Sequence, residues 1–275
     1  MEQSQLNLNP LVNVMKDTAN LLARKEVIPL FISGTTSNGT LSIDLVPPIQ
    51  LNANATHIIY VKSFTTWSNI PNVITGKNDN FTYTNNSGVT KTIIIPQGTY
   101  EIDQINQYIQ AQMQNNGDYN SSTTPVSYYV TISLNDPTYQ VVITTSNSYK
   151  VDFTPASSIG SLLGFPNIQI NPSGSATSAT GSTKIINILP VQAINIICNI
   201  ASGARLNGVP ENLLYSFGFD VALGSLISEK PNPIMPVLCN SKTISTISLQ
   251  FKDQNKNPVT FGGELITVLI VIEQL

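Results

Sequence analysis

The fold is decided by the stretch that begins Ile93-Ile94-Ile95-Pro96-Gln97-Gly98 and ends at Phe165-Pro166. After its first turn, residues 100–113 carry apolar side chains at spacings of three and four, at Ile102, Ile105, Ile109 and Met113. This spacing indicates an amphipathic α-helix, and it is the one clear case in the chain. A helix within an otherwise strand-like sequence marks the stretch as a unit of its own.

Three short β-segments and an apolar turn follow the helix. Residues 128–134 and 139–145 are joined by Asn135-Asp136-Pro137-Thr138, a loop with hairpin-turn chemistry, and residues 149–153 form the third segment. The stretch closes on the apolar turn at residues 158–166. We therefore expect an inserted small α+β subdomain over residues 93–166. Its predicted core consists of Ile102, Ile105, Ile109, Met113, Leu163 and Phe165.

The flanking sequence consists of short strand-like segments that turns and prolines separate. Segments such as residues 41–45, which alternate apolar and polar side chains, are typical of half-buried strands. Their number and regular interruption predict an all-β fold, an antiparallel two-sheet jelly-roll sandwich over residues 26–92 and 167–275. Residues 1–25 are predicted to be an N-terminal arm with a helical segment at 11–22. The arm either reaches a neighbouring subunit or an encapsidated polyanion, or it is a frayed terminus.

The composition excludes several classes of function. Charged residues make up only 11% of the 275 residues, whereas about 25% is average. A net charge of −3 offers no basic field, so we expect no specific nucleic-acid partner. Cys198 and Cys239 are too few for a disulfide framework or a metal cluster, and we interpret them as buried apolar thiols.

The sequence gives no sign of export or membrane insertion. The N-terminus is polar and lacks the basic and apolar pattern of a signal peptide. No apolar run reaches the roughly 18 residues that a membrane span needs. We therefore expect that the chain has no membrane span and that it is made in the cytoplasm.

The sequence contains no recognisable catalytic constellation. His57 is the only histidine, which excludes histidine-based triads and multi-histidine metal sites. The carboxylates are scattered, and residues 253–258 lack the glycine and terminal glutamate of a calcium loop. Trp67, Tyr128, Tyr129 and Tyr139 either line a sugar site or pack internally, and packing is the preferred interpretation. We expect no enzyme activity, catalytic residue, cofactor or metal.

The last strand is apolar on both faces. Leu265, Leu269 and Val271 lie on one face, and the other face carries Ile266, Val268, Ile270 and Ile272. A sandwich strand normally has one apolar and one polar face. We expect one row to fill the core and a partner subunit to cover the other. Ile266, Val268, Ile270 and Ile272 are the candidate interface, although the sequence alone does not decide between the rows.

Several short segments also follow one another in a recognisable order. They are Ser68-Asn69-Ile70-Pro71-Asn72-Val73, residues 94–102, 151–153, 158–165, 187–191, Asn207-Gly208, 229–234, 253–255 and Gly262-Gly263-Glu264. In this order the chain resembles the jelly-roll capsid proteins of Polinton/Maverick elements and adintovirus-like double-stranded DNA viruses, particularly the penton type. The likeness covers about residues 41–275. Related sequences usually carry an arginine immediately before the closing Gly-Glu, where this chain has Gly262.

The resemblance implies a structural function. It implies a virion protein, a penton subunit that assembles into a homopentamer at the capsid vertex and contacts the major capsid protein of the same particle. It also implies that the subunits are made in the host cytoplasm and assemble into the capsid. The alternative is a β-sandwich spike or lectin-like receptor-binding module, in which the insertion carries the ligand site. A glycan-processing enzyme is a more distant third possibility.

Overall fold

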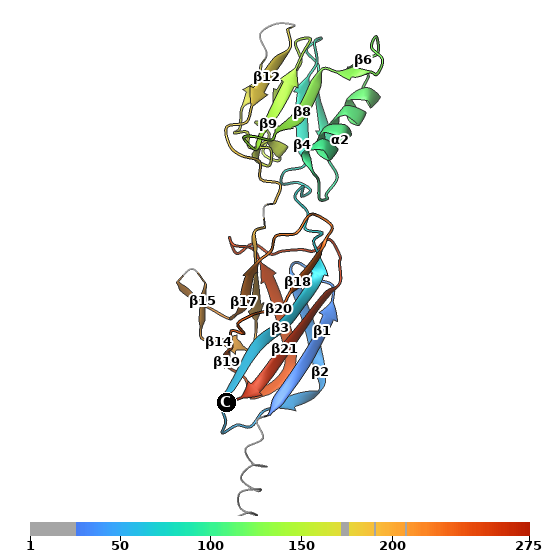
Figure 1. The fold of residues 1–275 in the computed structure, drawn as a ribbon. Coiled ribbons are helices and arrows are strands. Elements are labelled where there is room, and N and C mark those ends of the chain that lie inside the picture. The colour runs from blue at the N-terminus through green and yellow to red at the C-terminus, as the bar shows by residue number, and fades with distance from the viewer. Residues whose placement is uncertain (1–25, 172–175, 190, 207) are drawn as a thin grey trace, which may run out of the picture.

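The computed structural model describes residues 26–171, 176–189, 191–206 and 208–275. Two lobes lie end to end (Figure 1). The lower lobe consists of β-strands and contains the C-terminus, and the upper lobe contains the helix. The arm predicted at residues 1–25 lies outside the described residues.

The lower lobe is built from two antiparallel sheets. The first sheet has the order β1 (Val27–Gly34), β21 (Ile266–Gln274), β3 (His57–Trp67), β19 (Val237–Cys239) and β14 (Ala201–Ser202), and β18 (Leu226–Glu229) also pairs with β3. The second sheet has the order β17 (Leu213–Gly218), β13 (Ala193–Cys198), β20 (Thr243–Lys252) and β2 (Thr40–Gln50). A small hairpin, β15 (Ala204–Leu206) with β16 (Val209–Glu211), lies beside them.

The strand order is that of a jelly roll. The main strands β1, β3, β18 and β21 belong to the first sheet, whereas β2, β13, β17 and β20 belong to the second. The chain therefore crosses repeatedly between the sheets, as in the eight-stranded double Greek key. The predicted fold class, an all-β antiparallel jelly-roll sandwich, is confirmed.

The first hydrophobic core fills the space between these two sheets. Phe64 lies at its centre and packs against Phe217, Phe251 and Phe261, with ring centroids 5.2, 5.8 and 6.2 Å away. Aliphatic residues from both sheets surround this aromatic group. Because both sheets contribute to one core, the jelly roll is a single packed unit.

The upper lobe combines small sheets with the helix. One sheet has the order β11 (Gln169–Ile170), β10 (Lys150–Asp152), β4 (Asn80–Thr84) and β5 (Thr90–Ile94). The second has the order β12 (Ser178–Gly181), β9 (Gln140–Thr145) and β8 (Val130–Asn135), and a two-stranded ribbon pairs β6 (Tyr119–Asn120) with β7 (Ser127–Tyr128). The helices are α2 (Ile102–Asn115) and the short 3₁₀ helix η1 (Ile159–Ser161).

Helix α2 forms where the apolar spacing predicts it. Its N-terminus is closed by a capping box, in which Glu101 and Gln104 satisfy each other's backbone N–H groups. The Asn106 side chain accepts a 2.8 Å hydrogen bond from the backbone of Ile132 in β8, which fixes the helix beside that strand. The buried face of α2 is Ile102, Ile105, Ile109 and Met113.

A second hydrophobic core fills the upper lobe. It contains Ile102, Ile105, Ile109, Met113, Leu163 and Phe165, and all six side chains are at most 4% exposed. The core extends beyond the predicted bounds of 93–166, because Val73, Phe81, Tyr83 and Ile170 also belong to it. The reason is strand pairing: β4 joins β5 to β10, and β12 pairs with β9. The hairpin at residues 80–94 and the strand at 178–181 are therefore part of the upper lobe and not of the jelly roll.

The separate cores lead to a testable expectation for Ile109→Ala. Ile109 is fully buried in the upper core, and an isoleucine-to-alanine change in a core typically costs about 2–5 kcal/mol. We expect faster amide hydrogen exchange across the upper lobe with unchanged exchange in β3 and β21. Equal loosening of both lobes would show that the chain unfolds as one cooperative unit.

Candidate functional site

The terminal strand β21 presents its two apolar rows to different surroundings. Ile266, Val268, Ile270 and Ile272 are at most 1% exposed and belong to the jelly-roll core. They cannot form a subunit contact, so their assignment as the interface is wrong. Successive side chains of a strand point to opposite faces, and the other row, which includes Leu269 and Val271, therefore lies on the outside of the sheet.

Neighbouring strands extend this outer row into an apolar surface. Phe31 of β1 lies opposite Leu269, and Pro29 lies opposite Val271, which in turn lies opposite Tyr60 of β3. Phe31 is 74% exposed and Val27 is 54% exposed. We call this surface the apolar outer face. Val27, Pro29, Phe31 and Leu238 are exposed on it, Ile58, Tyr60 and Leu269 are half-buried, and Val271 is only 7% exposed.

The outer face of the second sheet is polar. Ser42 donates a 2.9 Å hydrogen bond to Ser248, Thr246 donates one of 2.7 Å to Asp44, and Thr243 donates one of 2.7 Å to Gln50. These side chains satisfy one another across β2 and β20, as expected for a water-exposed sheet face. The two outer faces of the sandwich thus differ in chemistry, and the apolar one is the candidate functional surface.

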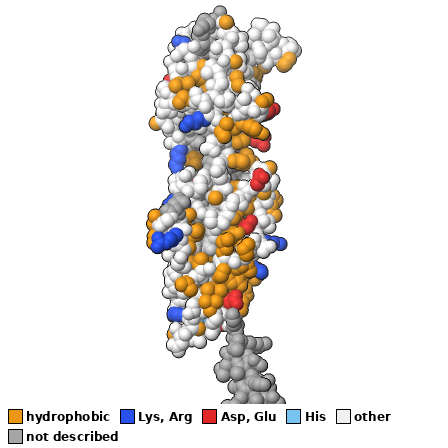
Figure 2. All heavy atoms as spheres, turned by 60° about the vertical axis from the view of Figure 1, so that its left-hand side comes forward, with side chains coloured by type: hydrophobic (Ala, Val, Ile, Leu, Met, Phe, Trp, Pro, Cys, Tyr) orange, Lys and Arg blue, Asp and Glu red, His pale blue; other side chains and the backbone are white. Residues whose placement is uncertain are grey.

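The energetic cost of leaving the apolar outer face in water is considerable. Each large aliphatic or aromatic side chain gains about 1.5–3 kcal/mol when it is fully buried. Large contiguous apolar patches are uncommon on monomers and mark interaction surfaces. Figure 2 shows hydrophobic side chains gathered on one side of the lower lobe. The apolar outer face is therefore the candidate interaction surface of the jelly roll.

A polar pair lies at the margin of the apolar outer face. The Tyr60 hydroxyl donates a 3.4 Å hydrogen bond to Glu273. Burial raises the pKa of Tyr60, and the charge and hydrogen bond of Glu273 raise it further. Tyr60 therefore remains a neutral donor, and its ring adds apolar surface to the face while its hydroxyl stays satisfied.

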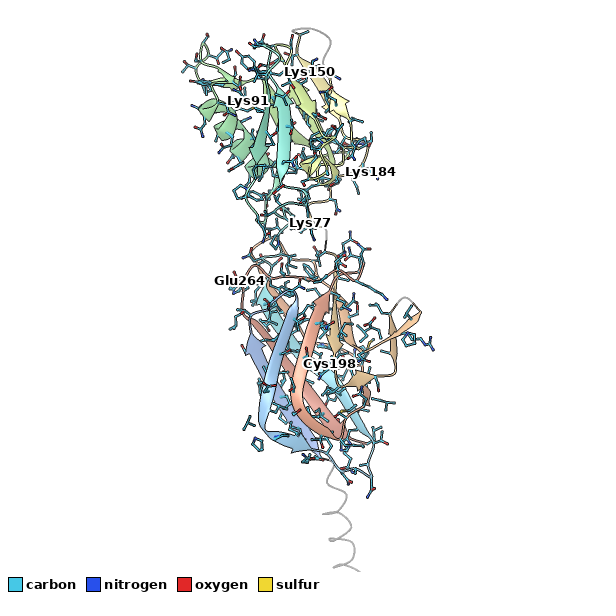
Figure 3. The ribbon with its side chains drawn as sticks, turned by 180° about the vertical axis from the view of Figure 1, so that it is seen from behind. Lys77, Lys91, Lys150, Lys184, Cys198 and Glu264 are labelled. Atoms are coloured by element: carbon cyan, nitrogen blue, oxygen red, sulfur yellow. The ribbon has the colours of Figure 1, made fainter. Side chains whose placement is uncertain are left out.

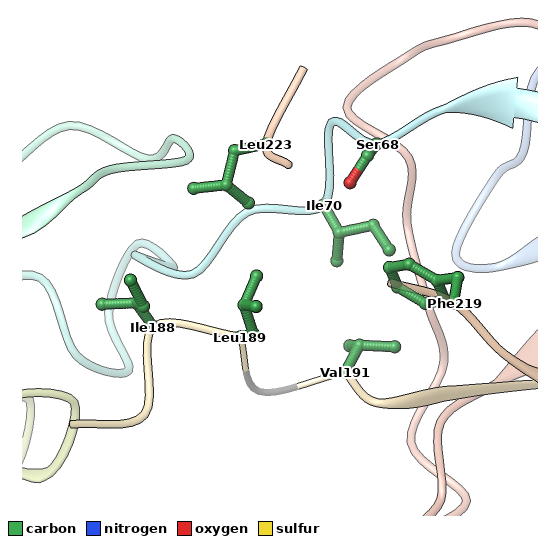
Figure 4. A pocket seen from close by; sticks show the side chains of 7 residues that line it. All are labelled: Ser68, Ile70, Ile188, Leu189, Val191, Phe219 and Leu223. Carbon is green, nitrogen blue, oxygen red and sulfur yellow. The ribbon is translucent and has the colours of Figure 1, made fainter. Parts of the chain in front are cut away.

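A second notable region is the neck, which consists of residues 68–72, 188–189 and 191. The Asn72 side chain donates hydrogen bonds to the carbonyls of Tyr100 and Ile188, at 2.7 and 3.0 Å, and accepts one from the Tyr100 amide at 2.9 Å. Asn72 therefore links both segments of the neck, residues 68–72 and 188–189, to Tyr100 just before helix α2. Beside these bonds is a small pocket, and the apolar side chains that line it are Ile70, Ile188, Leu189, Val191, Phe219 and Leu223 (Figure 4).

Segments that are far apart in the sequence meet at the neck. Asn69 donates a 3.1 Å hydrogen bond to Glu264, which lies at the upper end of the jelly roll (Figure 3). Gly262 has a φ of +61°, and a Cβ there would lie 2.7 Å from the Asn69 carbonyl oxygen. The position thus has no room for a side chain, because Asn69 lies against the Gly262 backbone.

Asp118 is the centre of a buried polar network in the upper lobe. It accepts hydrogen bonds from Lys91 at 2.6 Å, from Tyr83 at 2.8 Å and from Tyr149 at 3.0 Å. Burial alone would raise the pKa of Asp118, but the bonds from Lys91, Tyr83, Asn85 and Tyr149 outweigh it and lower the pKa. The charged carboxylate is therefore the form that this network holds. The sequence did not single out Asp118, because its partners come from distant strands.

Other residues that the sequence singled out are not brought together. His57 is 2% exposed at the start of β3, and its Nε2 lies 3.7 Å from Glu26. Trp67 ends β3 in the jelly roll, whereas Tyr129 stacks on Tyr149 in the upper lobe with ring centroids 4.7 Å apart. Trp67 and Tyr129, two of the aromatics that were weighed as a sugar site, thus lie in different lobes.

The remaining candidates have structural roles. Asp253 accepts backbone hydrogen bonds from Asn255 and Asn257, both 2.8 Å, which is a turn within its own loop. Cys198 is buried, and burial raises the pKa of its thiol to about 11, while Cys239 is half-buried. Among the described residues no three His, Cys, Asp or Glu side chains are grouped to hold a metal ion. The described part of the chain also has no helix with the length and hydrophobicity needed to cross a bilayer.

Comparison with known proteins finds matches among solved structures only, and 23 chains match. No family model and no curated protein matches the chain. The chain is similar to the crystal structure of the selenomethionine-labelled mavirus penton protein, with 11% sequence identity and a TM-score of 0.49 over 92% of this chain and 100% of that chain. A likeness of this size carries no functional argument. The jelly-roll assignment rests on the strand order.

Proposed function

We propose that the chain is a structural capsid subunit of the Polinton/Maverick and adintovirus-like type, which forms a homopentameric vertex and contacts the major capsid protein. It is a virion component and has no enzymatic role. The observation that carries the proposal is the apolar outer face of the first sheet. A surface of this kind requires a permanent partner, and another copy of the same chain is the partner that a closed ring supplies.

Further features of the chain support an assembly role. Its surface is poor in charge, since only 11% of its residues are charged, so neighbouring copies meet with little electrostatic repulsion or desolvation of ions. The apolar and polar outer faces give each jelly roll two unlike sides. A ring that closes by rotation uses a heterologous contact, in which one patch on each copy meets a different patch on the next copy.

The division of the chain fits this role as well. The jelly roll carries the apolar outer face, whereas the upper lobe has its own core and joins the jelly roll through the neck. We propose that the jelly roll forms the ring and that the upper lobe projects from it as a separate folding unit. The arm, residues 1–25, is the third part of this organisation.

The test is the mass of the protein in solution. We expect the full chain to sediment as a pentamer, and we expect Phe31→Lys to give a folded monomer. Phe31 is 74% exposed on its own subunit, so a lysine there is solvated in the monomer and is buried only on assembly. Sedimentation velocity measures the mass, and circular dichroism measures the fold.

Gln250→Lys is the matched control. Gln250 is exposed in β20 on the polar outer face of the second sheet, and the substitution adds the same charge to the same jelly roll. We expect this variant to assemble as the unmodified chain does. A full chain that sediments as a monomer up to high concentration would contradict the proposed function, and equal loss of assembly in both variants would show that charge alone disperses the subunits.

A further inference from the structure

The apolar outer face needs an occupant, and the chain carries a suitable segment in its arm. The arm sequence places apolar residues at spacings of three, four and seven, at Leu11, Val14, Met15, Leu21 and Leu22. Asn9 and Pro10 precede them, a pair that is favoured at the first positions of a helix. Residues 11–22 therefore have the sequence of an amphipathic helix with one apolar side.

The arm joins the jelly roll at the corner of the apolar outer face. Glu26 follows the arm, and its carbonyl accepts a 2.9 Å hydrogen bond from the Gln274 amide. The next residue, Val27, belongs to the face and lies opposite Glu273. Glu26, the residue that follows the arm, is thus fixed to the end of β21, directly beside the apolar outer face.

The sequence at the end of the arm contains no turn signal. To lie on the face of its own subunit, the chain would have to reverse direction just before β1. Leu21-Leu22-Ala23-Arg24-Lys25 contains no glycine, proline, asparagine or aspartate, the residues that form tight turns. These five residues have the composition of a helix rather than of a turn.

The dimensions of the two elements agree. As a helix, the twelve residues 11–22 are about 18 Å long at 1.5 Å per residue. The face runs along β1 from Val27 to Phe31, four steps of about 3.3 Å, or roughly 13 Å. One such helix is thus long enough to cover the exposed side chains of β1 and the row of β21 beside them.

We propose that residues 11–22 of each copy lie across the apolar outer face of an adjacent copy, with Met15 close to Phe31 and Leu269. This inference rests on the proposed function, because it supplies the occupant of the subunit contact. The body of a neighbour is a poorer complement, since the outer face of its second sheet presents the paired polar groups Ser42, Asp44 and Thr246. The arm presents an apolar side to an apolar face.

A disulfide trap in the full chain tests this placement. One tagged version carries Met15→Cys in the arm, and a second, with a different tag, carries Ser33→Cys, an exposed position in β1 beside Phe31. We expect mild oxidation of the co-assembled mixture to yield a disulfide-linked species that contains both tags. Gln250→Cys in place of Ser33→Cys is expected to yield no more of it than the unmodified chains, which report the background from Cys198 and Cys239.

The outcomes separate this proposal from the proposed function. If the chain assembles but Met15→Cys and Ser33→Cys do not cross-link, the body of a neighbour covers the face, and the arm proposal is wrong while the assembly role stands. A disulfide that forms only within a chain carrying both substitutions would place the arm on its own subunit and would overturn the proposal equally. A monomeric full chain would overturn the assembly role itself.

An independent measurement avoids any effect of oxidation. Met15→Asp replaces none of the described residues of the two cores and places a charge among the apolar residues of the arm sequence. We expect it to raise the concentration needed for half-assembly by at least about tenfold, which corresponds to about 1.4 kcal/mol. An unchanged concentration would exclude the arm from the contact.

Discussion

Ile270→Lys is expected to abolish folding of the jelly roll, whereas Leu269→Lys, one position away, leaves a folded but monomeric subunit. Ile270 is 0% exposed within the first core. A lysine there loses the burial of isoleucine, about 2–5 kcal/mol, and leaves an ammonium group without a partner in an apolar core at several kcal/mol more. The sum is comparable with the roughly 5–15 kcal/mol that stabilises a whole domain.

The comparison of these neighbours tests the orientation of β21. Both variants are measured by soluble yield, circular dichroism and sedimentation. Leu269→Lys is solvated on its own subunit because its side chain lies on the outside of the sheet, opposite Phe31. If both variants are insoluble, then the outer row of β21 is also essential to the fold of one chain, and the assembly interpretation of the face fails.

The sequence predicted the elements whose signals are local. The helix over Ile102–Asn115 followed from apolar spacing alone, and the jelly roll followed from short strands with regular turns. The two rows of β21 were also visible, because alternation along a strand needs no knowledge of its neighbours. These features depend on residues within one element.

The sequence did not show which of the two apolar rows of β21 faces the core. Both rows of β21 are apolar, and β1 has the same ambiguity, with Ile28, Leu30 and Ile32 on one side and Val27, Pro29 and Phe31 on the other. Only the packing of the second sheet against the first decides the matter, and that packing buries Ile32 and Ile270 together. Two apolar faces on one strand thus predict an interface without locating it.

The boundaries of the upper lobe required long-range pairing. Strand β4 precedes the predicted insertion, yet it pairs with β10, in which Val151 lies opposite Tyr83. The network around Asp118 arises in the same way, since Tyr83, Lys91 and Tyr149 come from three separate segments. The sequence around Asp118 gives no sign of this network, because its hydrogen-bond partners are far away in the sequence.

The second large effect is expected for Asp118→Ala, which removes the centre of that network. Lys91, Tyr83 and Tyr149 would each lose a hydrogen bond to a charged acceptor, and Tyr83 and Tyr149 are buried. Removing one member of a buried ion pair typically costs about 3–5 kcal/mol, because the remaining groups are left unpaired. Urea unfolding followed by hydrogen exchange in β4 and β10 measures the loss. Asp103→Ala, which removes an exposed carboxylate of α2, is the matched control and should change little.

The same carboxylate makes the upper lobe sensitive to acid. The pKa of Asp118 in the folded chain is lower than in the unfolded chain, where the pKa of an aspartate is about 3.9. The stabilisation from Asp118 is therefore complete above that pH and is lost as the pH falls through the folded-state value. Meanwhile burial and the bond to Asp118 raise the pKa of Tyr83, so the phenol remains a donor throughout. We expect the stability difference between the unmodified chain and Asp118→Ala to be constant from pH 7 to pH 5 and to shrink below pH 4. A difference that stays constant to pH 2 would show that the carboxylate is not held in its charged form.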